Sequence, residues 1–225
     1  MKDSIRVREW KHWSPHHIQS AATAAHLCLE LESAGNPQPT DLVRQRAFVT
    51  TSIFHCVAFL EALANELMAS CVLEAPFAQL ISKLSEDQTR RLAVLWNSGA
   101  DRMSTTSKFQ VILGVLDREV FDKGRNPYQD ANLVIRLRNE LVHYKPELTE
   151  RELGSPSELR HWLAGKFSLN PFTPASMADH LDSYLSAGCA AWAAKSSLGF
   201  ADDFYARLGV VPLYAEASPL ARELL

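Results

Sequence analysis

The sequence lacks the motifs by which many catalytic sites are recognised. Its nine glycines are scattered along 225 residues, and there is no Gly-x-Gly-x-x-Gly or Walker loop to hold a phosphate. The serine-hydrolase motif Gly-x-Ser-x-Gly and the zinc motif His-Glu-x-x-His are absent as well. Motifs therefore give no support to a dinucleotide-binding protein, a P-loop enzyme, a serine hydrolase or a zinc protease.

The chain has few cysteines, and they do not form a recognisable pair. They are Cys28, Cys56, Cys71 and Cys189. They are far apart, and each lies among apolar residues in a helical pattern, which indicates buried and reduced thiols. Reduced thiols fit a cytoplasmic location, and we expect no cofactor.

The histidines near the N-terminus do not form a metal motif. His12 and His16 are four residues apart, but they straddle the helix start that Ser14 and Pro15 predict. No acidic residue or cysteine stands at ligand spacing, so we expect no metal.

Neither charge nor hydrophobicity is extreme. The 23 basic and 26 acidic residues give a net charge of −3, so an RNA site would have to be a local basic patch. No uninterrupted run of about 18 apolar residues predicts a membrane span. The start of the chain, residues 1–6, is followed by no apolar segment typical of a signal peptide. We therefore expect a cytoplasmic protein with no membrane contact.

Helical signals follow one another along the chain, and no segment alternates as a β-strand does. Helices are expected at about 15–34, 41–74, 77–97 (one or two helices), from 104, at 132–144, from 156 to 165, and at 173–197, with a short helix and a tail in 198–225. The helix at 41–74 is hydrophobic nearly all round between Ile53 and Leu67, which predicts a central position. The expected fold is all-α, a single domain over 1–225 built as a bundle of about five to eight helices.

The segment 132–146 carries the most informative pattern. It is typical of a helix that Pro146 ends, with an apolar arc of roughly 200°. Arg138 lies inside that arc, and a buried arginine needs a carboxylate, a phosphate or a wet cleft because it keeps its charge. Glu61 and Asn65 share a face of the apolar helix, and Glu61 is the candidate partner of Arg138. The alternative is that Glu61 reaches solvent or caps a neighbouring helix.

Arg138 and His143 form the pattern Arg-x4-His, with the polar residue Asn139 directly after the arginine. In an all-α chain this resembles the signature of the HEPN superfamily, small helical bundles that often act as metal-independent ribonucleases. The resemblance covers the motif helix and, more loosely, the long helix before it. It implies a HEPN-like core at about 40–150, between the N-terminal helix 15–34 and a C-terminal helical extension at 155–225.

The residue types fit such chemistry. Histidine changes charge near neutral pH, and arginine can hold two phosphate oxygens at once. The resemblance implies that His143 is the general acid or base, that Arg138 steadies the phosphate, and that Asn139, Glu61 and Asn65 support the site. It also implies an RNA substrate, 2′,3′-cyclic phosphate ends, a homodimer through the motif helix, and a toxin–antitoxin or defence setting with an antitoxin or regulatory protein. The alternative is a non-catalytic HEPN-like helical module that binds a protein partner or a nucleotide, with a structural Arg138.

Overall fold

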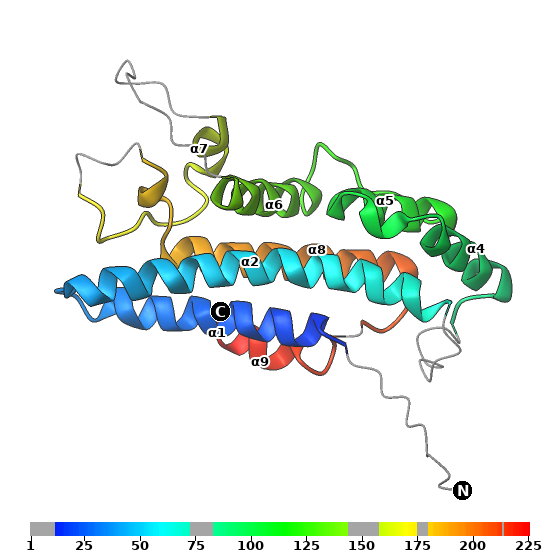
Figure 1. Ribbon diagram of the computed structural model, residues 1–225, viewed down its shortest axis with the longest axis horizontal. Helices are drawn as coiled ribbons and strands as arrows, with labels where there is room; N and C mark the ends of the chain where they lie inside the picture. Colours follow the sequence, from blue (N-terminus) through cyan, green and yellow to red (C-terminus); the bar gives the residue numbers. More distant parts are fainter. Residues whose placement is uncertain (1–11, 73–82, 144–157, 175–179, 213) are drawn as a thin grey trace, which may run out of the picture.

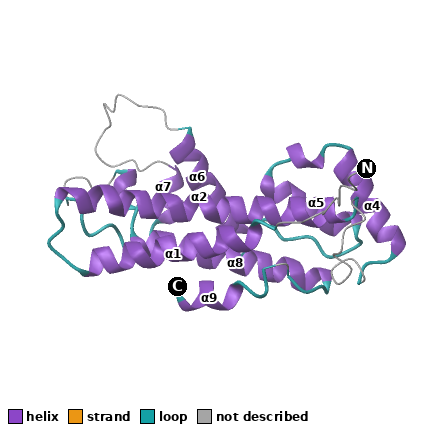
Figure 2. Ribbon diagram, turned by 60° about the horizontal axis from the view of Figure 1, so that its bottom comes forward, coloured by secondary structure: helices purple, strands orange, loops and turns teal. Residues whose placement is uncertain are grey.

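The computed structural model describes residues 12–72, 83–143, 158–174, 180–212 and 214–225. These residues are all-α, as expected, and none of them lies in a strand (Figure 1 and Figure 2). Their α-helices are α1 Ser14–Ser33, α2 Pro39–Ser70, α4 Glu86–Asn97, α5 Thr105–Val115, α6 Tyr128–Val142, α7 Glu158–Leu163, α8 Ala187–Leu208 and α9 Ser218–Glu223. Two short 3₁₀ turns are η1 Ala100–Arg102 and η3 Leu181–Ser183.

The long helix α2 is the centre of the bundle. It packs against α1, α4, α5, α6 and α8, with α1 on one side of it and α4, α5 and α6 on the other (Figure 1). Its buried apolar side chains are Val49, Ile53, Cys56, Val57, Phe59, Leu60, Leu63, Ala64, Leu67 and Met68. Nearly all of them come from the stretch that is hydrophobic nearly all round, so the predicted central position of this helix is confirmed.

By length and composition α2 is also apolar enough to cross a membrane. Half of its most apolar stretch is buried inside the bundle. A core helix meets the same criterion, and the buried half of this stretch packs against the neighbouring helices.

Helix α1 pairs closely with α2 through small side chains. Its buried residues are Ser14, Ile18, Ala21, Ala22, Ala24, Ala25 and Cys28. Alanines at the contact let the two helix axes approach, and the short link between the helices makes them antiparallel neighbours (Figure 1). α9 packs against α1 as well.

The C-terminal part of the chain differs from the expectation. A helix was expected at 173–197, whereas the structure has the turn η3 and then α8, which begins only at Ala187 and continues to Leu208. Residues 175–179 of the expected helix lie outside the described residues. Ser186 explains the late start, because its Oγ accepts the backbone N–H of Cys189 at 3.0 Å as an N-cap.

Helix α8 is a core element, in contact with α1, α2 and α6. Phe200 stacks on Phe121 with ring centroids 4.5 Å apart, and its edge meets Phe109 at 4.9 Å. Phe204 also meets Phe109, at 4.7 Å. This aromatic cluster joins α5, the segment before α6, and α8, and it fixes the position of α6 over the bundle.

Candidate functional site

The motif helix is present as α6, anchored by its apolar side and open on the other. It begins at Tyr128, four residues before the expected start, and ends at Val142. Its buried residues are Tyr128, Ala131, Leu133, Val134 and Leu137. They face α2 and α8, which leaves the C-terminal turn of α6 with its polar side chains toward solvent.

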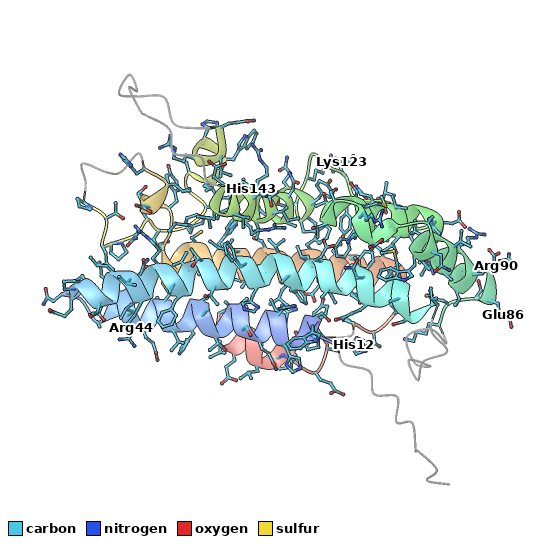
Figure 3. The ribbon with its side chains drawn as sticks, viewed as in Figure 1. His12, Arg44, Glu86, Arg90, Lys123 and His143 are labelled. Carbon is cyan, nitrogen blue, oxygen red and sulfur yellow. The ribbon has the colours of Figure 1, made fainter. Side chains whose placement is uncertain are left out.

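The three motif residues lie together at this end of α6. Arg138 is half-buried, and Asn139 and His143 are exposed. His143 is the residue that ends the helix: its backbone N–H donates to the carbonyl of Asn139 at 2.9 Å, and its φ and ψ of −104° and 29° leave the helical region. Figure 3 shows it at the end of α6. The partial negative charge at a helix C-terminus attracts a cation there.

Arg138 and His143 are not strictly on one face of the helix. Five residues correspond to about 140° of rotation around an ideal helix. Because His143 has left the helical conformation, its ring is not bound to that rotation. The rotation of an ideal helix therefore does not fix where the His143 ring lies relative to Arg138, and both residues belong to the open end of α6.

Glu61 has a different partner from the one expected. Its Oε2 accepts the hydroxyl proton of Thr105 at 2.7 Å, and its Oε1 forms an ion pair with Lys108. The Nζ of Lys108 also donates to Oδ1 of Asn65 at 2.9 Å. Glu61 and Asn65 do share a face of α2, as expected, but α5 lies opposite that face and supplies a lysine in place of Arg138.

Lys108 is not among the site residues predicted from the sequence, although its position in the helical pattern of α5 indicates burial. Its side chain is 0% exposed, whereas that of Glu61 is 36% exposed. Lys108 stands one helical turn from Thr105 and Ile112, in the row of α5 residues that face the core. A lysine in a core-facing row calls for a buried carboxylate, and Glu61 supplies it.

A short helix, α7, packs beside the motif. α7 contacts α6, and Arg136 of α6 forms an ion pair with Glu158 of α7 at 3.3 Å. His161 and Trp162 of α7 are exposed. Pro146, which was expected to end the motif helix, lies outside the described residues.

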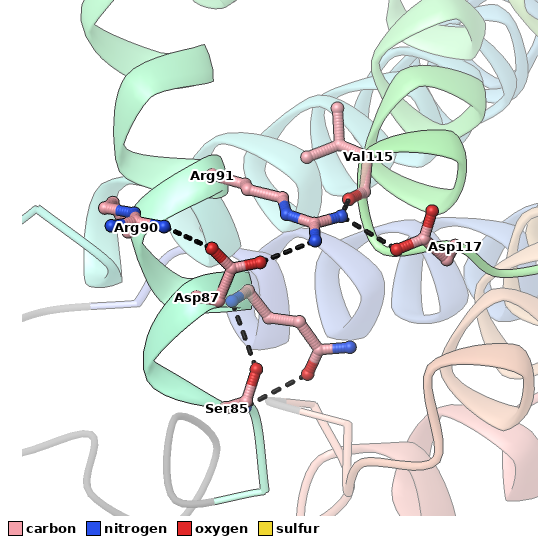
Figure 4. Close-up of polar contacts among 7 residues, drawn as sticks. Ser85, Asp87, Arg90, Arg91, Val115 and Asp117 are labelled. Atoms are coloured by element: carbon pink, nitrogen blue, oxygen red, sulfur yellow. Dashed lines mark hydrogen bonds and ion pairs between the residues drawn. The ribbon is translucent and has the colours of Figure 1, made fainter.

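A second polar cluster lies between α4 and α5 (Figure 4). Asp87 pairs with Arg90 and Arg91, and Arg91 also donates to Asp117 at 2.7 Å and to the carbonyl of Val115 at 3.1 Å. Hydrogen bonds from Arg90 and Arg91 lower the pKa of Asp87, and bonds to Asp117 and Asp87 raise the pKa of Arg91. The cluster borders an open depression of about 470 Å³. Since carboxylates already pair both guanidinium groups, this cluster ties α4 to α5.

The cysteines are buried as expected, apart from the half-buried Cys71. Burial raises the pKa of every thiol, to about 12 for Cys56 and to about 11 for Cys71. Thiols with such values are poor nucleophiles near neutral pH. Among the described residues, no group of three or more histidine, cysteine or acidic side chains is placed to hold a metal ion.

Comparisons with protein-family models, with curated proteins and with solved structures found no match to this chain. Function is therefore inferred from the residues of α6 and their surroundings.

Proposed function

We propose that the chain is a metal-independent endoribonuclease of the HEPN type, with Arg138 and His143 as its catalytic residues. The observation that carries the proposal is the pairing of Glu61 with Lys108, because that carboxylate then does not neutralise Arg138. Arg138 is half-buried and His143 is exposed, and both belong to the C-terminal end of α6. A permanent cation beside a titratable imidazole is what a phosphate-cleaving site needs.

The reaction starts with the 2′-hydroxyl of the RNA, which attacks the adjacent phosphorus. The bond from phosphorus to O2′ forms as the bond to O5′ breaks, leaving a 2′,3′-cyclic phosphate and a 5′-hydroxyl. A base takes the proton of the 2′-hydroxyl, and an acid gives a proton to the departing O5′. Arg138 stabilises the extra negative charge on the phosphate oxygens, while Asn139 orients the RNA.

One histidine cannot stand on both sides of the same phosphate. A homodimer through α6 solves this problem, because it brings two copies of His143 to one cleft, one as base and one as acid. The exposed side of the last turn of α6 carries Val142, which is 49% exposed, next to Asn139 and His143. In the proposed dimer the partner's α6 would cover this apolar side chain.

The test is a cleavage assay on RNA of mixed sequence in the presence of EDTA. We expect His143→Ala to lower the rate by about 100-fold or more, because proton transfer is lost. Arg138→Lys should lower it too, since lysine keeps the charge but lacks the planar fork that holds two oxygens. Products should carry 2′,3′-cyclic phosphate ends by mass spectrometry.

Matched controls are available on neighbouring elements. Arg136→Lys changes an arginine of the same helix that pairs with Glu158, and His161→Ala removes an exposed histidine of α7. Both should cleave at the wild-type rate. Wild-type protein that leaves RNA intact, or variants at Arg138 and His143 that cleave normally, would contradict the proposal and favour the non-catalytic binding module.

A further inference from the structure

Two histidines of the long helix pair meet away from the proposed catalytic site. The Nδ1 atoms of His17 in α1 and His55 in α2 are 3.0 Å apart, and both side chains are half-buried. A hydrogen bond between two ring nitrogens needs one N–H and one free lone pair. The contact therefore holds a single proton and requires at least one neutral ring.

The start of α1 is fastened to α2 by a second contact just beside the first. Oε1 of Glu66 accepts the backbone N–H of Trp13 at 2.8 Å and that of Ser14 at 3.0 Å. Its Oε2 accepts the hydroxyl of Ser14 at 2.6 Å and lies 3.3 Å from Nδ1 of His12. A carboxylate at a helix N-terminus also interacts favourably with the helix dipole.

We propose that the His17–His55 pair is a proton-sensitive latch, and that acidification releases the start of α1 from α2. Uptake of two protons by the neutral pair would place two imidazolium ions where the structure has one hydrogen bond. Like charges at this distance repel, and neither ring could then accept from the other. The two rings therefore attract each other through a hydrogen bond at neutral pH and repel each other in acid.

The charged surroundings of the pair modify this response without reversing it. Burial lowers the pKa of both rings; the charge of His55 lowers that of His17 further, Glu66 raises it, and His16 lowers it. α8 and α9 also pack against α1, but none of their described side chains is among the groups that shift either pKa.

The sign of the pH effect follows from these directions. A histidine released from the latch takes up a proton below its ordinary pKa of 6.5, before the paired histidine does. Proton uptake below that value therefore favours the released state. The latch is at full strength above pH 6.5 and weakens as the pH falls toward the lowered pKa values of the pair.

The test compares wild-type protein with His55→Asn, whose side-chain amide can take the place of Nδ1 but does not titrate. Unfolding in urea is measured in EDTA at several pH values between 7.5 and 5.5. For the wild type we expect the unfolding equilibrium constant to rise severalfold more over this range than for His55→Asn, because the pKa values of the paired histidines are lowered in the folded state. His26→Asn changes a half-exposed histidine of α1 and should keep the wild-type profile.

Hydrogen exchange shows where the release occurs. With labelling times scaled for the intrinsic rate at each pH, peptides from the start of α1 should lose protection in acid before those of α6 and α8. His17→Gln gives an independent variant if His55→Asn folds poorly. The same pH profile in wild type and latch variants, or equal loss of protection in all helices, would overturn the proposal.

Discussion

Lys108 shows how a single residue can decide which elements meet. Its side chain is fully buried, and the ion pair with Glu61 and the hydrogen bond to Asn65 compensate for the loss of water. The sequence shows each of these residues but not that they face one another, because α2 and α5 are separated by a whole helix. The pairing depends on tertiary structure, and it engages Glu61 with Lys108 and not with Arg138.

At this site Glu61→Gln should destabilise the protein more than Lys108→Met does. The glutamine leaves the buried ammonium group without its counter-charge, which we expect to cost about 2–4 kcal/mol, less than a fully buried pair because Glu61 is partly exposed. Lys108→Met removes the buried charge, and the carboxylate can turn to solvent, so the cost should be below about 1 kcal/mol. Urea unfolding gives both free energies.

The double variant provides the control for this comparison. Glu61→Gln combined with Lys108→Met should be more stable than Glu61→Gln alone, because the unpaired charge is gone. Replacing Arg46, which forms an exposed ion pair with Asp182, should change the free energy of unfolding little. Equal costs for the two single variants would mean that Lys108 is not held by Glu61 in solution.

At the scale of the element, most helix starts follow from local signals and some do not. Ser85 caps α4 by accepting the N–H of Gln88 at 3.2 Å, and acidic residues follow it in the first turn of the helix. The start of α8 was not predicted, because no other helix-start signal accompanies Ser186 in the sequence. The hydroxyl of Ser186 also donates to the carbonyl of Ser168 at 2.6 Å, and this contact between distant residues has no local signal. Local chemistry predicts helices well, and it does not predict what packs beside them.

Ser186→Ala should therefore cost more than Ser85→Ala. Ser186 is fully buried and loses both its cap and the bond to Ser168, so we expect about 2 kcal/mol. Ser85 is exposed and water can replace its hydroxyl, so the cost should be about 0.5–1 kcal/mol. Urea unfolding of both variants under one buffer gives the comparison, and equal losses would contradict the buried cap.

In the candidate site, too, local features could be predicted from the sequence and tertiary contacts could not. The motif helix, its apolar side and the exposed His143 follow from the pattern in the sequence. The partner of Glu61 does not, because α5 contributes it from a part of the chain with no motif. The His17–His55 contact was not predicted either, because thirty-eight positions separate the two histidines. His55 interrupts the apolar stretch of α2, but nothing in its spacing points to a partner in α1.

At the scale of the whole molecule, the reactivity of the cysteines measures how readily the bundle opens. Cys28, Cys56 and Cys189 lie in the contacts among α1, α2 and α8, and burial raises the pKa of each thiol. In DTNB at neutral pH the native protein should react slowly, with the half-buried Cys71 first. All four thiols should react promptly in urea, since the thiolate is the reactive form and burial no longer suppresses it. A fast reaction of Cys56 in native protein would mean that the core opens readily.

The assembly of two molecules is the last property to test, and it depends on the proposed function. If two copies meet through the end of α6, a charge at Val142 should separate them, because a buried lysine at such a contact lacks a partner. Val142→Lys should give a monomer by light scattering and lose RNA cleavage, while its circular dichroism stays that of the folded helical bundle. Val120→Lys is the matched control: Val120 is 48% exposed, nearly the same as Val142, but lies before α6. That variant should remain dimeric and active. A Val142→Lys protein that cleaves RNA as a monomer would show that one copy of His143 suffices.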